Sequence, residues 1–151
     1  MRAADATAID ASRGSWLRAP CSLTQVCAVI DRTTPPAIVT ALCERFGMAP
    51  QFSVLELQDA AGLHAQWLAS FGALGADVSR PPADADRLLA PLPPGCLLAL
   101  CSREVDKLDW LGSVTGRPCR LIALGAGAEA ALEAVGAVWM EALNAQLAGE
   151  R

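Results

Sequence analysis

The sequence predicts a single-domain α/β protein, a three-layer sandwich in which about four mostly parallel strands alternate with helices. Short apolar runs alternate with longer segments whose apolar residues recur every three or four positions. The length of 151 residues suits one domain, and 53% apolar against 19% charged residues is typical of a folded chain. Residues 1–15 are small, polar and aperiodic, so we expect a flexible tail before a domain over 16–151.

The clearest element is a strand, a turn and a helix near the N-terminus. The run 25–30 is apolar and rich in β-branched residues, which predicts a buried strand that Asp31 ends. Thr34 is a candidate N-cap, and Pro35 suits the first helical position because its missing N–H has no partner there. The apolar residues of 38–46 then fall on one helical face, which predicts an amphipathic helix.

The rest of the chain repeats this alternation. Further strands are predicted over 52–57, 96–101 and 119–124, and helices after Asp59, after Ser102 and from about Ala128. In the second helix Leu63, Trp67, Leu68, Phe71 and Leu74 form an expected inward stripe, and in the third Val105, Leu108 and Leu111 do so. The stretch 75–94 is rich in Pro, Asp and Ala and predicts an irregular crossing around one short helix at 84–89. Strands that alternate with helices indicate right-handed parallel crossovers.

Charge and cysteine spacing exclude several classes of protein. The net charge is −4 and no Lys/Arg cluster occurs, which argues against a nucleic-acid partner. Every apolar run is shorter than the roughly 20 residues of a membrane span, and residues 1–10 lack the apolar stretch of a signal peptide. The six cysteines form no C-x-x-C pair, and His64 is the only histidine, so neither a zinc site nor a disulfide framework is indicated. We therefore expect reduced thiols and a cytoplasmic location.

One edge of the predicted sheet gathers the residues that best suit a ligand site. Asp31, Ser102 and Gly125 each end or follow a strand, and ligands of open α/β sheets bind at this carboxyl edge. The same residue types also serve as turn and cap residues that satisfy backbone N–H groups, so both interpretations stay open. Gly125 and Gly127 resemble part of a dinucleotide fingerprint, but no second strand follows to carry the acidic residue that binds the ribose. No cofactor is expected.

The sequence holds few candidates for catalysis or for partner binding. Ser102 follows Cys101 at a strand end, yet the G-x-S-x-G pattern is absent, and His64 beside Trp67 suits the margin of a core. No catalytic or metal-binding set converges, which favours a non-enzymatic role. Trp16 and Trp110 are candidate partner contacts, because an exposed tryptophan marks an interface, and the loop 81–94 is a third candidate.

The segment VCAVIDRTTPPAIVTALCERFGMAPQFSVLE, residues 26–56, resembles the opening of the type VI secretion adaptor family, the effector-loading chaperones. The likeness rests on a strand ending in Asp31, the Pro35-Pro36 turn, a helix and a second strand. The run GCLLALCSREVDKLDWLGSV, residues 95–114, looks like that family's next strand, serine and leucine-bearing helix. The resemblance implies an α/β adaptor whose partner is a secreted effector.

Two function classes follow from the sequence. The first is a non-enzymatic protein-interaction module, such as an adaptor, chaperone or small accessory subunit, that binds another protein through an apolar surface. The alternative is a small-molecule-binding or enzymatic α/β domain that uses the carboxyl edge near Asp31, Ser102 and Gly125. The high apolar content and the lack of a convergent catalytic set favour the first class.

Overall fold

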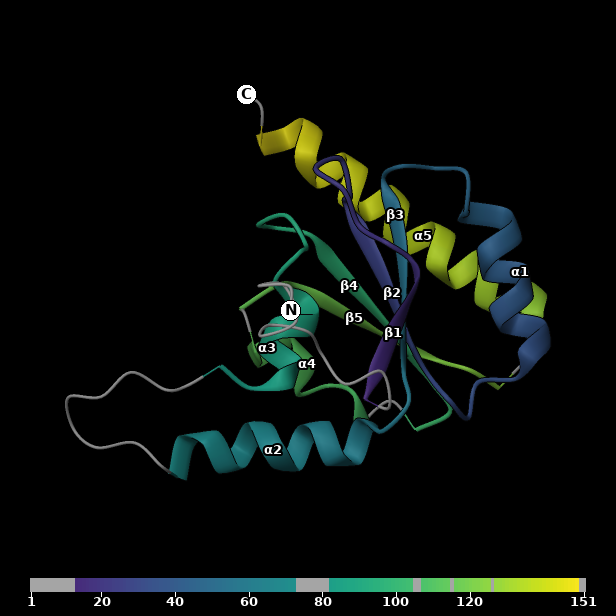
Figure 1. Cartoon of the computed structure of the whole chain (residues 1–151). Helices are drawn as coiled ribbons and strands as arrows, with labels where there is room; N and C mark the ends of the chain where they lie inside the picture. The colour runs from purple at the N-terminus through teal and green to yellow at the C-terminus, as the bar shows by residue number, and fades with distance from the viewer. Residues whose placement is uncertain (1–12, 73–81, 105–106, 115, 126, 150–151) are drawn as a thin grey trace, which may run out of the picture.

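The fold is a five-stranded sheet covered by helices on both faces (Figure 1). The computed structural model describes residues 13–72, 82–104, 107–114, 116–125 and 127–149. The strands are β1 (Gly14–Arg18), β2 (Val26–Asp31), β3 (Phe52–Leu57), β4 (Leu97–Ser102) and β5 (Cys119–Ala123). The helices are α1 (Pro36–Phe46), α2 (Ala60–Gly72), α3 (Asp84–Leu89), α4 (Leu111–Val114) and α5 (Ala128–Gly149). The predicted α/β class is confirmed.

The strand order β1-β3-β2-β4-β5 places β2 at the centre of the sheet. β3 and β4 flank β2 in parallel, and β5 lies parallel to β4 at one edge. The chain leaves β2 through α1 to reach β3, and then crosses back over β2 to reach β4. The carboxyl ends of β2 and β4 therefore meet where the direction of winding reverses, the usual position of ligand sites in such sheets.

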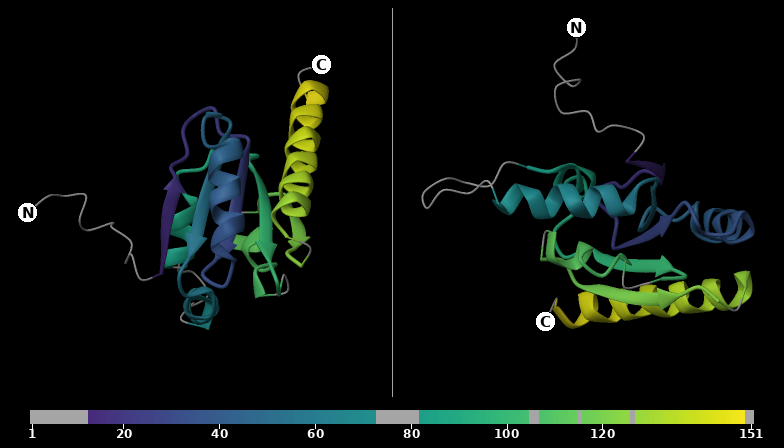
Figure 2. Two further views of the ribbon diagram at one scale, coloured as in Figure 1. Left: turned by 90° about the vertical axis from the view of Figure 1, so that its right-hand side faces the viewer. Right: turned by 90° about the horizontal axis from the view of Figure 1, so that it is seen from below.

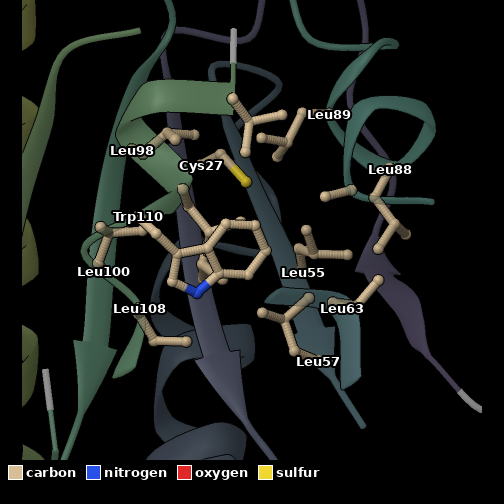
Figure 3. Packing of buried hydrophobic residues seen from close by; sticks show 14 of the residues in the cluster. Cys27, Leu55, Leu57, Leu63, Leu88, Leu89, Leu98, Leu100, Leu108 and Trp110 are labelled. Carbon is tan, nitrogen blue, oxygen red and sulfur yellow. The ribbon is translucent and has the colours of Figure 1, made fainter. Parts of the chain in front are cut away.

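Two apolar cores lie on opposite faces of the sheet, as expected for strands buried on both sides. On one face, side chains of β2, β3 and β4 pack against α2, α3 and α4; Figure 3 shows part of this cluster. On the other face, alternate residues of the same strands pack against α1 and α5. Figure 2 shows α2 and α5 on opposite sides of the sheet, which makes three layers.

The expected N-terminal tail overlaps a strand. Residues 1–12 lie outside the described residues, whereas Gly14 and Ser15 begin β1, which pairs antiparallel with β3 at an edge of the sheet. The segment GSWLR has no β-branched residue and no clean alternation, so its sequence carries little strand signal. Backbone pairing with β3 holds it in place.

Two further departures concern the start of α1 and the segment after Ser102. Thr34 does not cap α1: the N-cap is Pro35, without a side-chain hydrogen bond, and the helix begins at Pro36. The helix expected after Ser102 is replaced by turns and the four-residue α4. Leu108 and Trp110 are both buried there, and a regular helix would put residues two apart on different faces. Val105 lies outside the described residues.

Among the described residues, none of the helices combines the length and the apolar character that a membrane span requires.

Candidate functional site

The structure brings Asp31 and Ser102 together at the carboxyl edge of the sheet. Asp31 is the last residue of β2 and Ser102 the last residue of β4, and the two strands are neighbours. Both side chains are buried, with 9% of Asp31 and 1% of Ser102 exposed. The hydroxyl of Ser102 donates a hydrogen bond to Asp31 Oδ2 over 2.6 Å. The pair therefore links the ends of the two central strands.

The remaining polar atoms of this pair are also occupied. Asp31 Oδ1 accepts hydrogen bonds from the backbone N–H of Thr33, at 2.9 Å, and from the Thr33 hydroxyl. Ser102 Oγ accepts one from the backbone N–H of Glu104 at 3.1 Å. These are the local contacts of turn and cap residues. The geometry matches the structural interpretation of both residues, because a ligand would have to displace bonds that already exist.

Gly125 lies at the same edge but takes no part in this cluster. The backbone N–H of Leu124 donates to the carbonyl oxygen of Ser102 at 3.0 Å, so the chain leaves β5 beside the end of β4. Gly125 follows and is exposed. Gly127 has a φ of +95°, which an L side chain rarely adopts. The conformation of this turn therefore accounts for a glycine at 127 without a bound nucleotide.

His64 lies in α2 and packs against aromatic rings. Its ring stacks on Trp110, with centroids 4.6 Å apart and an angle of 11° between the planes. Ser102 hydrogen-bonds to a carboxylate instead. The structure thus supplies no Ser–His pair among these contacts, and the position of His64 at the margin of the core agrees with the sequence interpretation.

The two tryptophans expected at an interface differ in exposure. Trp110 is only 7% exposed, belongs to the core beneath α2 (Figure 3) and donates from Nε1 to the carbonyl oxygen of Lys107 at 2.9 Å. It is therefore a core residue and not a surface contact. Trp16 is partly buried in β1 and packs against the same core. Of the candidate loop, residues 82–94 are described and contain α3, whose Leu88 and Leu89 are buried.

The outward face of α2 is a feature that the sequence analysis missed. Leu63 and Trp67 point into the core as predicted, but Leu68 and Phe71 are 53% and 43% exposed, so their expected burial is wrong. Leu74 lies outside the described residues. The rest of the exposed face consists of small apolar residues, namely Ala61, Ala65 and Ala69. The sequence did indicate an apolar outer face, because Ala60–Gly72 contains no charged residue that could face the solvent.

Aromatic packing supports this face from below. The ring of Phe71 meets Trp67 edge to face, with centroids 5.0 Å apart. Trp67 in turn contacts Trp110 at 5.5 Å. An aromatic ring that is half exposed and held against a rigid core needs little ordering when a partner binds, which lowers the entropic cost of association. We call Ala61, Ala65, Leu68, Ala69 and Phe71 the α2 face.

The cysteines provide no metal site or disulfide. All six are free thiols. Burial raises the pKa of Cys96 to about 11 and that of Cys101 to about 12, and it raises the pKa of Cys27 further. These groups are inert, neutral core residues at physiological pH. Within the described part of the chain, no three His, Cys, Asp or Glu side chains are grouped to hold a metal ion.

Comparisons of the chain with protein-family models, with curated proteins and with solved structures found no match.

Proposed function

We propose that this protein is a non-enzymatic interaction module, of the adaptor, chaperone or accessory-subunit kind, that binds another protein through the α2 face. The observation that carries the proposal is an uncharged helix with Leu68 and Phe71 half exposed on its outer side. Helices that cover a globular core normally present polar residues to water. An apolar outer face of this kind is typical of a surface that a partner covers.

The chemistry of the α2 face fits a protein partner. Phe71 offers an aromatic ring already positioned by Trp67, and large rings at the centre of an interface contribute most of its binding energy. Ala65 and Ala69 leave room for close approach of another helix or strand. The helix carries no charge that would have to be desolvated. The expected partner surface is therefore apolar and shallow.

The family resemblance of residues 26–56 and 95–114 supports the same class of function. Type VI secretion adaptors are effector-loading chaperones, so a secreted effector, or a subunit of a complex, is the partner that the resemblance implies. We place this activity in the cytoplasm, and six unpaired thiols suit a reducing compartment.

The test compares two substitutions that each put a carboxylate in place of an exposed apolar residue. Leu68→Glu alters the α2 face, and Met48→Glu alters a residue that is 90% exposed in the connection before β3. A partner captured from the native host is purified, and its affinity for each variant is measured by calorimetry. Leu68→Glu is expected to weaken binding by at least about tenfold, or about 1.4 kcal/mol. Met48→Glu is expected to bind as the wild type does.

Two results would overturn the proposal. One is a partner that binds the wild type and Leu68→Glu equally well, with both proteins folded by circular dichroism. The other is a protein that remains monomeric and captures nothing from its own host under any condition. In either case the α2 face is not the binding surface.

The alternative, a small-molecule or enzymatic site at the carboxyl edge, has one observation in its favour. Asp31 and Ser102 lie where the winding of the sheet reverses. A thermal-shift screen with nucleotides and common metabolites tests it. A ligand of this edge should raise the melting temperature of the wild type but not of Gly125→Val. A Cβ at Gly125 meets no atom within 4 Å, so the fold should tolerate the valine.

A further inference from the structure

A groove of about 570 Å³ lies between α1 and α5, on the face of the sheet opposite α2. Its apolar lining consists of Phe46 from α1 and of Leu132, Trp139 and Met140 from α5. The rings of Phe46 and Trp139 meet edge to face, with centroids 5.8 Å apart, and this contact holds the two helices side by side. The walls of the groove are therefore apolar and fixed by packing within the chain. We call this surface the α1–α5 groove.

The α5 side of the groove has the form of a helix-packing surface. Leu132, Gly136 and Met140 are each four residues apart, so they form one ridge along the helix. Met140 is 57% exposed although it is a large apolar side chain. A Cβ at Gly136 meets no atom within 4 Å, so the backbone is open to close approach at this position. Ridges of this spacing are the ones that most often interdigitate when two helices pack.

Charged side chains border the groove at opposite ends. The helix α1 follows β2 and α5 follows β5, so both helices run from the carboxyl edge of the sheet towards its amino edge. Glu129 and Glu133, near the start of α5, therefore border one end, and Arg45, near the end of α1, borders the other. All three are exposed, and none forms an ion pair with another described residue.

This charge pattern is complementary to itself when a second copy is turned around. If two α5 helices cross antiparallel at Gly136, Glu133 of one copy lies level with Trp139 of the other, because both are three residues from the crossing point. Arg45 precedes Phe46, which contacts Trp139, so Arg45 lies at that level too. Leu132 of one copy then meets Met140 of the other. A parallel crossing would instead bring like charges together.

We infer that the α1–α5 groove is the interface of a symmetric homodimer, in which Arg45 of each copy pairs with Glu133 of the other. In a twofold dimer the same patch of both subunits meets, so a surface must complement itself, as this groove does. The inference does not depend on the α2 face, because α2 and α5 lie on opposite sides of the sheet (Figure 2). The dimer leaves both α2 faces open, which would give it two sites for one partner and raise its avidity.

Sedimentation velocity of the full-length protein at a series of concentrations measures the Kd of the dimer. The wild type should dimerise at micromolar concentration. Arg45→Glu and Glu133→Arg each put two pairs of like charges into the interface, so each should weaken dimerisation by at least about tenfold. Arg103→Glu makes the same charge change at an exposed position that does not line the groove, and it should dimerise as the wild type does.

A mixture of the two charge variants tests the pairing itself. In a heterodimer of Arg45→Glu with Glu133→Arg, both pairs again join opposite charges, one of them with its signs reversed. The equimolar mixture should therefore dimerise with a Kd within about threefold of the wild type, although each variant alone does not. No charge effect outside the Arg45–Glu133 contact would restore association in this way.

A steric variant locates the contact on α5. Gly136→Trp places a ring in the groove, where a side chain meets no atom of the chain, and should abolish dimerisation. Ala145→Trp places the same ring on the same helix outside the groove and should leave the Kd unchanged. If Gly136→Trp does not fold by circular dichroism, the charge variants at exposed positions decide. A wild type that is monomeric at every concentration, charge variants or a folded Gly136→Trp that dimerise as the wild type does, or a mixture that stays monomeric would each overturn the inference.

Discussion

Ser102 donates a hydrogen bond to Asp31 across 71 positions of sequence, and this contact joins the two strands at the centre of the sheet. Without this bond each strand would end in a buried polar side chain that lacks this partner, near the point where the direction of winding of the sheet reverses. The bond satisfies both groups at once and leaves Asp31 Oδ1 for the turn at Thr33. A position that often holds a ligand is here closed by the protein's own side chains.

Ser102→Ala should therefore lower stability by about 1–3 kcal/mol, because Asp31 Oδ2 loses its donor and the Glu104 N–H loses its acceptor. Urea unfolding followed by circular dichroism measures the change. Ser113→Ala, in an exposed position of α4, should stay within about 0.5 kcal/mol of the wild type. Equal stability of the two variants would mean that the Ser102–Asp31 bond contributes nothing.

Buried thiols should make the protein sensitive to alkali. Burial raises the pKa of Cys96 from 9.0 to about 11 and that of Cys101 from 9.0 to about 12. Above about pH 9 the unfolded chain loses these thiol protons while the folded chain keeps them. The unfolded state then binds fewer protons, so the free energy of unfolding falls as the pH rises, by up to about 1.4 kcal/mol per pH unit for each thiol.

The chain suits this measurement because it contains no tyrosine and only one lysine, Lys107. Urea unfolding at about pH 8 and about pH 10 gives the loss. Cys101→Ala should reduce that loss, whereas Cys21→Ala, which alters an exposed thiol, should not. A free energy of unfolding that is constant over this range would contradict the prediction.

The positions of the parallel strands could be predicted because strands buried on both faces are continuous apolar runs. β3 has the predicted bounds, and β2 and β4 differ from theirs by one residue. β1 could not be predicted, since pairing with β3 holds it and its side chains are mostly half exposed. Local sequence carries no information about a partner strand that lies far along the chain.

The candidate site shows the same limit. The sequence placed Asp31 and Ser102 at one edge, but their direct contact depends on β2 and β4 being neighbours, which strand order decides. The burial of Trp110 follows from a turn that replaces a predicted helix. Leu68 and Phe71 are exposed because another face of α2 packs on the core. The sequence could not predict which face packs inward, because the helix has no charged residues to mark its outer side.

Arg117 should stabilise the end of α3 and the connection that follows it. Its guanidinium donates to the carbonyl oxygens of Leu92, at 2.8 Å, and Pro93, with a longer contact to Leu89. The carbonyl oxygens of Leu89 and Pro93 also accept the backbone N–H groups of Leu92 and Cys96, so the guanidinium adds a second donor to each and links the turns that follow α3. Arg117→Ala should cost about 2 kcal/mol in urea unfolding.

Arg103→Ala removes an exposed guanidinium and is the control for Arg117→Ala, with little effect expected. Arg117→Lys keeps the charge but lacks the planar set of donors, so it should fall between the alanine variant and the wild type. A lysine variant as unstable as the alanine variant would show that the planar set of donors, and not the charge alone, stabilises this connection. An alanine variant as stable as the wild type would contradict the prediction.

Trp110 and Trp16 offer the sharpest test of how the core beneath α2 is built. Trp110 is buried, touches Trp67 and His64 and donates to Lys107, whereas Trp16 is partly exposed on the edge strand β1. Trp110→Ala should cost about 3–5 kcal/mol because it leaves a cavity. Trp16→Ala should cost only about 1–2 kcal/mol, since less apolar surface is lost from the core.

The variant Trp110→Phe separates the two contributions of this residue. It keeps an aromatic ring in the core but loses the Nε1 hydrogen bond to Lys107. The free energy of unfolding should fall by about 1 kcal/mol through the loss of that bond. Unfolding monitored by circular dichroism avoids the change in fluorescence that each substitution causes. If Trp16→Ala proves the more destabilising of the two alanine variants, the pairing of β1 contributes more to the core than the ring of Trp110 does.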